Sequence, residues 1–285
     1  GHILSHDQLE ACLLRRAGYE TRVLAEASDS HEENPPSMAD FLRRELRWCN
    51  GNFQYLRLLG LRGLPIVSRV QLWLAIQAYV SAAAWILFIA LGAVLVAMDS
   101  QVGEVPLWAG LGLFATVMTL NLMPRLMGLG QVLADRERAA TWGGRGRLIV
   151  SGAVDVAVSM LTAPVIAFGL TCFTIGLFFG KRVGWDAQQR SRARLEWSEA
   201  AQVLWPQTLA GLVLAVWFAI QAPWALAFGA PVLLPLVFAI PIAVLTAHPG
   251  FSRWSRRAGL FDTPLDPCAG PQAEAHLPAL SPKQA

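Results

Sequence analysis

Residues 70–98 read VQLWLAIQAYVSAAAWILFIALGAVLVAM and hold no charged side chain. A helix needs roughly 20 apolar residues to cross the hydrocarbon core of a bilayer, so this stretch predicts a membrane-spanning helix. The composition of the whole chain agrees, because 54% of its 285 residues are hydrophobic and only 15% are charged. A soluble domain carries about a quarter charged residues. We therefore expect a mainly α protein, built as a polytopic membrane helical bundle.

Four more apolar stretches follow this first one, at Pro106–Met123, Leu148–Gly180, Trp205–Gln221 and Trp224–Thr246. As a single helix, the third stretch would be about 50 Å long, against a hydrocarbon core of about 30 Å. Ala163-Pro164 lies near its middle, and we expect a hairpin turn at that point. The sequence thus predicts a transmembrane region over residues 69–250 with about six crossings.

The distribution of charge favours six crossings over five. Residues 99–105 hold two acids and no base. Basic residues gather before the first apolar stretch, between the second and third, after the third and after the last. If residues 148–180 cross twice, every basic segment lies in the cytoplasm, as basic loops prefer. If they cross once, the basic segment Lys181–Arg194 is external. We therefore expect both ends to be cytoplasmic, with residues 251–285 forming a disordered tail that is rich in proline, alanine and polar residues.

The polar N-terminal part of the chain predicts two helices. Ser5 with Gln8 forms a capping-box pattern before an apolar-periodic run. Gly18 is placed to end that helix. Ser37 is placed to cap a second helix, which runs through Trp48.

Tyr19–Ala25 lies between these helices and predicts a short strand. Residues 1–68 are too few to hold a full core alone, so we expect them to be the C-terminal remnant of an α/β domain. The chain also opens at Gly1 and enters directly into motif-bearing sequence. We interpret it as the C-terminal portion of a longer protein.

Ser5-His6-Asp7 opens the first predicted helix. Three adjacent residues cannot form a Ser/His/Asp relay, which needs groups brought together from separate positions. Asp7 by itself lies in the first turn, where the helix dipole favours a charged carboxylate. Such a group is suited to remove a proton from an attacking hydroxyl. The alternative is that Asp7 only stabilises the N-terminus of its helix.

Arg44, Arg47 and Trp48 fall at i, i+3 and i+4, so they share one face of the second helix. Two arginines can bind a diphosphate through several charge-assisted hydrogen bonds. A tryptophan beside them offers a flat apolar surface to a sugar ring. The alternative is a basic amphipathic helix that lies on anionic lipid.

Together these two motifs resemble the acceptor side of processive glycosyltransferases of family 2, in which an Asp deprotonates the acceptor and a (Q/R)xxRW helix holds it. The stretches GHILSHDQLEACLLRRAGYE and HEENPPSMADFLRRELRWCNGN narrow the resemblance to the synthases of osmoregulated periplasmic glucans. The resemblance implies a GT-A fold for the N-terminal remnant. It also implies transfer of glucose from UDP-glucose to a growing β-glucan, coupled to export through the membrane. Asp7 would be the base, and Arg44, Arg47 and Trp48 would hold the diphosphate and the acceptor.

A third motif, Gly184-Trp185-Asp186-Ala187-Gln188-Gln189-Arg190, follows the long apolar stretch. Its position is similar to that of the gating loop in cellulose and hyaluronan synthases, and its sequence resembles the glucan synthases. The resemblance therefore implies a gating loop with Trp185, Asp186, Gln188 and Arg190. The alternative is an interfacial tryptophan with basic residues that set the topology.

The sequence gives no sign of a metal or nucleic-acid site of its own. The four cysteines are scattered without CxxC spacing, and the net charge of +3 is small. The resemblance implies a divalent metal, Mg²⁺ or Mn²⁺, bound by a DxD motif that would lie upstream in the same protein. It further implies the bacterial inner membrane with a cytoplasmic active site, and a periplasmic partner that processes the glucan.

Two other functions remain as alternatives. One is a different processive polysaccharide synthase, for cellulose, hyaluronan or chitin, although the GWDAQQR loop argues against it. The other is a polytopic transporter, whose mark would be inverted repeats that this sequence does not display. Asp155 is the single charged residue of Leu148–Gly180. An ionisable group at such a place is a functional candidate, or a side chain that reaches the interface, and it has no assigned role.

Overall fold

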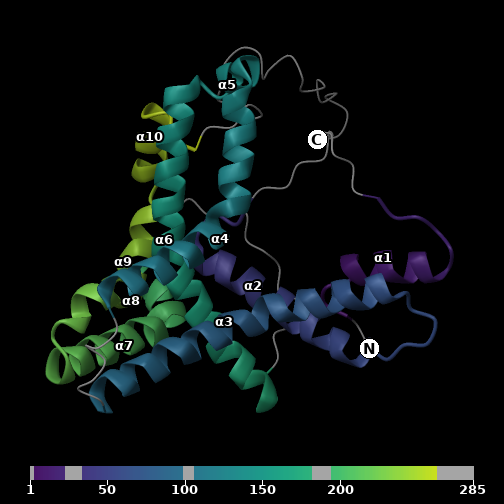
Figure 1. Ribbon diagram of the computed structural model, residues 1–285, viewed down its shortest axis with the longest axis horizontal. Helices are drawn as coiled ribbons and strands as arrows, with labels where there is room; N and C mark the ends of the chain where they lie inside the picture. Colours follow the sequence, from purple (N-terminus) through teal and green to yellow (C-terminus); the bar gives the residue numbers. More distant parts are fainter. Residues whose placement is uncertain (1–2, 23–33, 99–105, 182–193, 262–285) are drawn as a thin grey trace. The chain divides into compact units, whose positions relative to one another are not determined.

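The structure, a computed structural model, describes residues 3–22, 34–98, 106–181 and 194–261, and every regular element in these ranges is helical (Figure 1). In chain order the elements are α1 (Asp7–Arg16), α2 (Met38–Gln54), the 3-10 turn η1 (Tyr55–Arg57), α3 (Ile66–Met98), α4 (Leu107–Ala134), α5 (Arg136–Thr141), α6 (Arg145–Phe178), α7 (Trp197–Gln221), α8 (Ala225–Val237), α9 (Ala239–Thr246) and α10 (Pro249–Arg257). The mainly α architecture predicted from the composition is therefore confirmed.

The helices form two compact units. Among the described residues, unit 1 comprises α1, α2, α3, α7, α8, α9 and the part of α6 from Leu161 onward. Unit 2 comprises α4, α5, α10 and the part of α6 before Leu161. Both N-terminal motifs belong to unit 1, so the candidate site is built within that unit.

The predicted strand after α1 is not found where the structure describes it. Gly18 ends α1 as expected, with a φ of +92°, and the N–H of Tyr19 donates to the carbonyl of Leu14 at 3.0 Å. Tyr19–Arg22 then continues without regular structure, and residues 23–25 lie outside the described ranges. A strand needs a partner for its backbone groups, and no such partner lies among the described residues of the N-terminal segment.

One of the two predicted helix caps is confirmed and the other is wrong. The N–H of Asp40 donates to Ser37 Oγ at 3.2 Å, which caps α2. The N-cap of α1 is His6, and its side chain makes no capping bond. Ser5 instead makes contacts with a residue beyond α2, and these help to build the candidate site.

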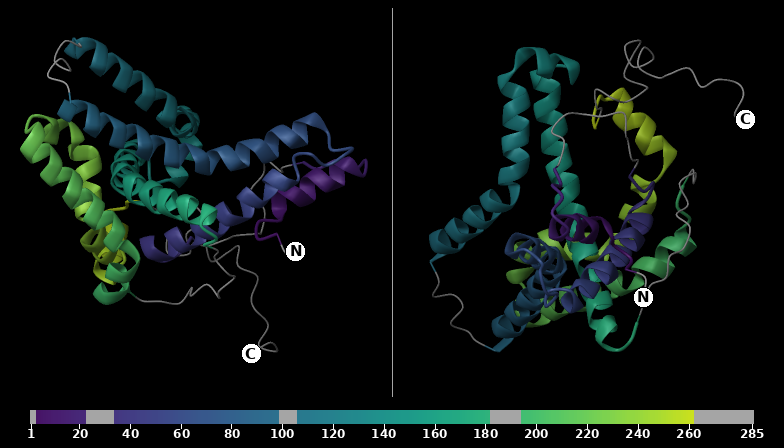
Figure 2. Two further views of the ribbon diagram at one scale, coloured as in Figure 1. Left: turned by 90° about the horizontal axis from the view of Figure 1, so that it is seen from below. Right: turned by 90° about the vertical axis from the view of Figure 1, so that its right-hand side faces the viewer.

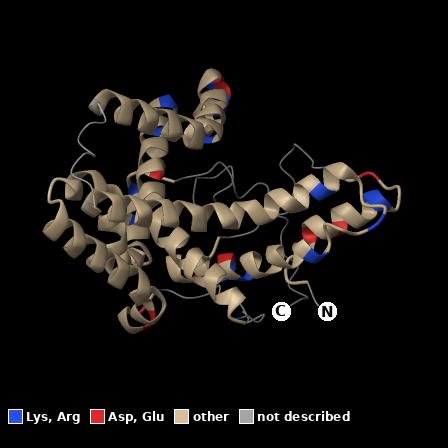
Figure 3. Cartoon of the chain, turned by 60° about the horizontal axis from the view of Figure 1, so that its bottom comes forward, with Lys and Arg blue, Asp and Glu red and all other residues tan. Residues whose placement is uncertain are grey.

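Four helices of the described ranges are long and apolar enough to cross a membrane, namely α3, α4, α6 and α7. The pair α8 and α9 is bent by 60° and adds a fifth if it forms one span. Charged residues are absent from most of the length of α3 (Figure 3). These features are those of a multi-pass membrane protein, with four or five candidate spans where the sequence predicts about six.

The hairpin predicted at Ala163-Pro164 is wrong, because α6 runs through both residues as one helix of 34 residues. Proline removes one backbone N–H, but the flanking turns keep their hydrogen bonds and the helix continues. Prolines also lie inside α4, α7 and α8. A proline inside an apolar stretch of this chain therefore does not by itself end a helix.

In unit 1, α3 and α7 both begin beside α2 (Figure 1). Glu199 in the first turn of α7 accepts a hydrogen bond from Arg43 of α2 at 2.9 Å. The two long helices meet again at their far ends, where Trp217 Nε1 donates to the carbonyl of Ala93 at 3.0 Å. They therefore run in the same direction away from α2.

The end of α6 also lies beside α2, because Phe173 and Cys49 share one buried apolar cluster. Residues 182–193 therefore connect two helix ends that both contact α2. We expect a cysteine placed at Gln188 to lie on the same side of the membrane as one placed at Gly60, and on the opposite side from one at Gly103. The measurement is labelling of spheroplasts by a membrane-impermeant maleimide, in a background that lacks the native cysteines.

The expected result of that measurement is labelling at Gly103 alone, since basic flanks face the cytoplasm. Because α6 is one continuous helix, this result requires that only one of α4 and α6 crosses the membrane. Labelling at Gln188 would show that α6 ends on the far side, and would also exclude the gating-loop interpretation.

Unit 2 is built on α4 and the first part of α6, which the short helix α5 connects (Figure 2). Asp135 caps α5 by accepting from the N–H groups of Glu137 and Arg138, at 2.9 and 3.2 Å. The same unit includes α10, in which Phe251 and Trp254 pack at 5.7 Å between ring centroids.

Candidate functional site

α2 carries the Arg44–Trp48 motif, and its position is fixed by its buried side. Leu42, Leu46, Cys49 and Phe53 recur at helical spacing and pack against apolar side chains of α3, α6 and α7. An ion pair adds to this contact, because Arg43 Nη1 lies 2.9 Å from a carboxylate oxygen of Glu199 on α7. The helix therefore presents its motif from a rigid support.

Arg44 lies between two aromatic rings of its own helix. Its guanidinium carbon is 4.8 Å from the centroid of the Phe41 ring and 4.7 Å from that of Trp48, which is the distance range of cation–π contacts. The structure therefore brings Arg44 and Trp48 together, as their spacing predicts. Trp48 remains 39% exposed beside the stacked guanidinium, and Arg47 lies one turn beyond Arg44 on the same helix.

The positive charge of Arg44 is incompletely compensated. Among the described residues, the carboxylate that pairs with it is that of Glu45, at 3.8 Å, and Arg44 Nη1 donates to Asn34 Oδ1 at 3.4 Å. Arg44 Nε is buried without a hydrogen-bond partner there. Burial raises the pKa of the Glu45 carboxyl, and Arg44 and Tyr79 offset only part of that rise. This environment is suited to binding an anion.

Glu45 itself was missed by the sequence reasoning. Its carboxylate oxygen lies 3.5 Å from the hydroxyl of Tyr79 on α3, so it connects the motif helix to the first membrane helix. The signal in the sequence was its position inside the Arg44–Trp48 motif. Its partner is 34 residues away and carries no local signal.

The segment before α1 is docked on the C-terminal half of α2. The hydroxyl of Tyr55 donates to the carbonyl of Ser5 at 2.7 Å and lies 3.1 Å from Ser5 Oγ. The N–H of Leu4 donates to Gln54 Oε1 at 3.0 Å. A Cβ added to Gly51 would lie only 2.5 Å from the backbone nitrogen of Ser5, so the two backbones approach closely because this residue is glycine.

This docking places the two sequence motifs next to each other. Gly51 follows Trp48 by three residues, or about 5 Å along the helix axis. Positions 44, 48, 51 and 55 recur at helical spacing and share one face of the helix and its continuation. Ser5, two residues before Asp7, therefore contacts the face that carries Arg44 and Trp48.

Asp7 begins α1 with its carboxylate in solvent. Its side chain is 85% exposed, and the carboxylate lies 3.2 Å from Nδ1 of His6. Burial raises the pKa of the Tyr55 phenol, and the nearby charge of Asp7 contributes to that rise. Asp7 therefore lies two residues after the docked Ser5, and its carboxylate is accessible to a bound molecule.

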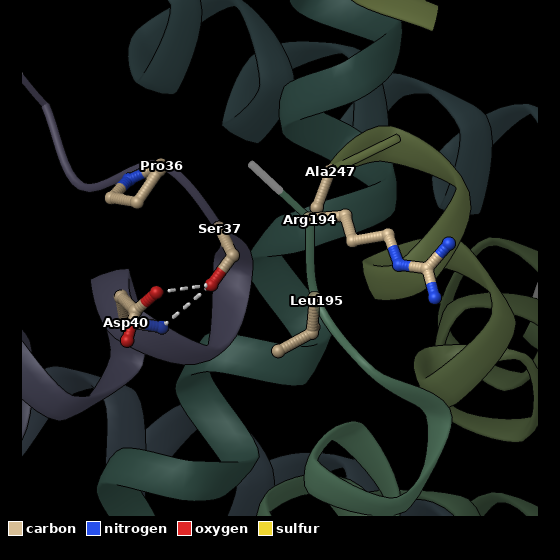
Figure 4. A pocket seen from close by; sticks show the side chains of 6 residues that line it. All are labelled: Pro36, Ser37, Asp40, Arg194, Leu195 and Ala247. Atoms are coloured by element: carbon tan, nitrogen blue, oxygen red, sulfur yellow. Dashed lines mark hydrogen bonds between the residues drawn. The ribbon is translucent and has the colours of Figure 1, made fainter. Parts of the chain in front are cut away.

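The predicted gating loop, with Trp185, Asp186, Gln188 and Arg190, lies outside the described residues. The chain is described again from Arg194, and Leu195 is buried in the cluster that also holds Ala39 of α2. Figure 4 shows a small pocket at this point, where Pro36 and Ser37 before α2 face Leu195 and Ala247. Arg194 and Leu195 thus lie beside the start of α2.

Within the described ranges, no three His, Cys, Asp or Glu side chains converge in a way that could hold a metal ion. The divalent metal that the resemblance implies would be bound by residues upstream of this sequence, and its presence stays a prediction. No step of the chemistry is assigned to a metal on these residues.

Comparison with known proteins shows which sequences this chain resembles. Residues 3–98 match the family model of glycosyl transferase family group 2. The chain is 33% identical, over 93% of its length, to the glucans biosynthesis glucosyltransferase H of Vibrio cholerae serotype O1. This chain is similar to that glucosyltransferase over nearly its whole length. Proteins with the same name from Bradyrhizobium diazoefficiens and Pseudomonas entomophila are 34% and 32% identical, over 93% and 95% of the chain.

The family resemblance drawn from the two N-terminal motifs is thereby confirmed. The chain spans 39% of the length of the Vibrio glucosyltransferase and 37% and 33% of the other two. No solved structure matches it. The family match covers both motifs together with α1, α2 and α3.

Proposed function

We propose that this chain is the acceptor side and the membrane part of a glucosyltransferase, which transfers glucose from UDP-glucose to a growing β-glucan. The product would be the backbone of osmoregulated periplasmic glucans, exported as it is made. The observation that carries the proposal is the docking of the Ser5–Asp7 segment on the face of α2 that holds Arg44 and Trp48. The similarity to glucans biosynthesis glucosyltransferases supports the choice of substrate.

Asp7 is the general base of the proposed reaction. Its carboxylate takes the proton of the acceptor hydroxyl while that oxygen forms a bond to C1 of glucose and the bond from C1 to UDP breaks. The high exposure of Asp7 leaves it accessible to the end of a polysaccharide. Asp7 lies in the first turn of α1, at the end of the helix to which negative charges are attracted.

Arg44 and Arg47 bind the diphosphate, and Trp48 contacts the acceptor sugar. Arg44 is the better-defined of the two arginines, because its guanidinium is held in place by stacking and its charge is only partly balanced. Trp48 is partly exposed beside it. The sugar and the leaving group would then meet at the segment that carries Asp7.

The remaining parts of the proposal rest on the resemblance and the arrangement of helices. The donor half of the site, with its DxD motif and divalent metal, would belong to the upstream half of the same protein. Residues 182–193 would form the gating loop, since both of its flanking helices contact α2. The enzyme would lie in the bacterial inner membrane with this site in the cytoplasm, and a periplasmic partner would process the emerging glucan.

Separate measurements on Arg47 and Trp48 test the proposal. In membranes that carry the complete protein, we expect Arg47→Ala to weaken inhibition by the product UDP about tenfold or more, because a contact to a charged group is worth about 1.5–3 kcal/mol. Trp48→Ala should chiefly shorten the glucan chains and should weaken UDP inhibition less than Arg47→Ala does, because Phe41 still stacks on Arg44. Both readouts come from one assay of glucose incorporation at increasing UDP.

The matched control is Trp48→Phe, which keeps an aromatic ring against Arg44 and should retain most of the chain length. If both alanine variants only release the protein from membranes, and catalyse normally in detergent, α2 is a lipid-binding helix. That outcome would exclude the acceptor-site interpretation.

A further inference from the structure

Asp155, the residue without an assigned role, is paired in unit 2. Its carboxylate lies 3.3 Å from Nη1 of Arg125 on α4, and the same nitrogen donates to Ser159 Oγ at 2.7 Å. Asp155 and Ser159 are one turn apart on α6, so Arg125 bonds to one face of that helix. A charged pair on two apolar helices is costly to maintain, and this cost invites a functional explanation.

A cavity of about 270 Å³ lies beside the pair. Its lining residues are Trp142, Leu148, Ser151, Gly152, Asp155, Gly259 and Phe261. Four of these positions, 148, 151, 152 and 155, recur at helical spacing and form one wall along α6. The volume is close to the lower limit of small-molecule sites, which suits a ligand of the size of one sugar.

The opposite wall of the cavity is held against α6 by specific contacts. The N–H of Phe261 donates to Ser151 Oγ at 2.9 Å. Gly259 has a φ of +65°, and an added Cβ there would coincide with the guanidinium of Arg147. A larger residue at this position would have to displace the Arg147 guanidinium and adopt a left-handed backbone, so this wall of the cavity is closely packed.

The chemistry of the lining decides the class of ligand. Asp155 offers carboxylate oxygens, but Arg125 already balances its charge, so the cavity does not call for a cation. The Ser151 hydroxyl accepts from Phe261 and keeps its own proton for donation. Trp142 and Phe261 add aromatic surface. A carboxylate, a hydroxyl and aromatic rings together match a neutral molecule with several hydroxyl groups and an apolar ring face.

We propose that this cavity is a glycosyl-binding site, separate from the residues of the transfer site. One sugar ring packs against Trp142, its hydroxyls donate to Asp155, and Ser151 donates to a sugar oxygen. The contact with Arg125 orients the Asp155 carboxylate. This site goes beyond the proposed function, because it binds a sugar and takes no part in the transfer reaction.

The test is photo-crosslinking in the complete protein in lipid nanodiscs. The probe is a β-linked glucotriose that carries a diazirine, and labelled peptides are mapped by mass spectrometry. We expect labelling of the peptide that contains residues 142–155, with competition by unlabelled glucotriose. Trp142→Ala and Asp155→Asn should each lower this labelling by about tenfold, through lost ring contact and lost charge-assisted hydrogen bonds respectively.

The matched control is Trp108→Ala, which removes an exposed tryptophan of α4 that does not line the cavity and should leave labelling unchanged. Asp155→Asn keeps the shape of the side chain, so it tests the site even if Trp142→Ala impairs folding. Equal labelling in wild type and Asp155→Asn would overturn the proposal. So would labelling of this peptide by a photoreactive phospholipid and not by the glucotriose, which would assign the cavity to lipid. If the wild-type protein is labelled by the glucotriose but incorporates no glucose into polymer, the proposed transferase function is refuted and the glycosyl-binding site stands.

Discussion

Asp7→Asn abolishes glucose transfer in the complete protein, if Asp7 is the base of the reaction. Loss of a general base typically lowers the rate about 10²–10⁴-fold. The amide has the same shape but cannot accept the proton of the acceptor hydroxyl, while binding of UDP-glucose should stay near normal because the donor is held elsewhere. The measurement is incorporation of labelled glucose into polymer, beside direct binding of UDP-glucose. Turnover at the wild-type rate would exclude Asp7 as the base.

Glu10→Gln provides a matched control on the same helix. Glu10 is exposed like Asp7, and its carboxylate also lies 3.2 Å from Nδ1 of His6. The substitution therefore removes an equivalent charge from the first turns of α1 without touching the proposed base. We expect transfer close to that of the wild type. If Glu10→Gln lowers the transfer rate as much as Asp7→Asn does, the negative charge of α1 is required and Asp7 is not the base.

The membrane helices could be predicted because they depend on composition along a continuous stretch. Residues 70–98 fall within α3, and the runs after residues 106 and 205 fall within α4 and α7. The hairpin at Ala163-Pro164 could not be predicted correctly. A proline in water usually ends a helix, but in an apolar protein the cost of unpaired backbone groups keeps α6 continuous.

The site was predictable only where its parts are close in the sequence. Arg44 and Trp48 lie one turn apart on a helix, so their contact follows from helical spacing. The contacts of Ser5 with Gly51 and Tyr55 join residues about fifty positions apart. From the local sequence, Gly51 is only a residue of low helix propensity inside a helix. Its role follows from the backbone of Leu4 and Ser5 that lies against it in the structure.

That close approach gives the second prediction, on a residue with no side chain to contribute. We expect Gly51→Ala to lower glucose transfer by roughly tenfold to a hundredfold, because a displacement of about 1 Å at a reacting group can cost that much. The new Cβ would lie 2.5 Å from the backbone nitrogen of Ser5 and 2.7 Å from its Cβ. Because one of these atoms belongs to the backbone, the segment that leads to Asp7 must move.

The helix propensity of alanine should stabilise α2 in this variant, so a loss of activity cannot be explained by a weaker helix. Alanine is favoured over glycine inside a helix by about 1 kcal/mol, so α2 by itself should be more stable in the variant. Gly60→Ala is the control, since nothing lies within 4 Å of a Cβ added there, and its transfer rate should match the wild type. The assay is glucose incorporation at saturating UDP-glucose, together with the thermal unfolding temperature in detergent.

A Gly51→Ala protein that transfers glucose normally would mean that Ser5–Asp7 does not dock on α2 during catalysis. A protein that loses transfer while UDP-glucose binding and thermal unfolding stay close to those of Gly60→Ala would show that the contact between these two motifs positions the base.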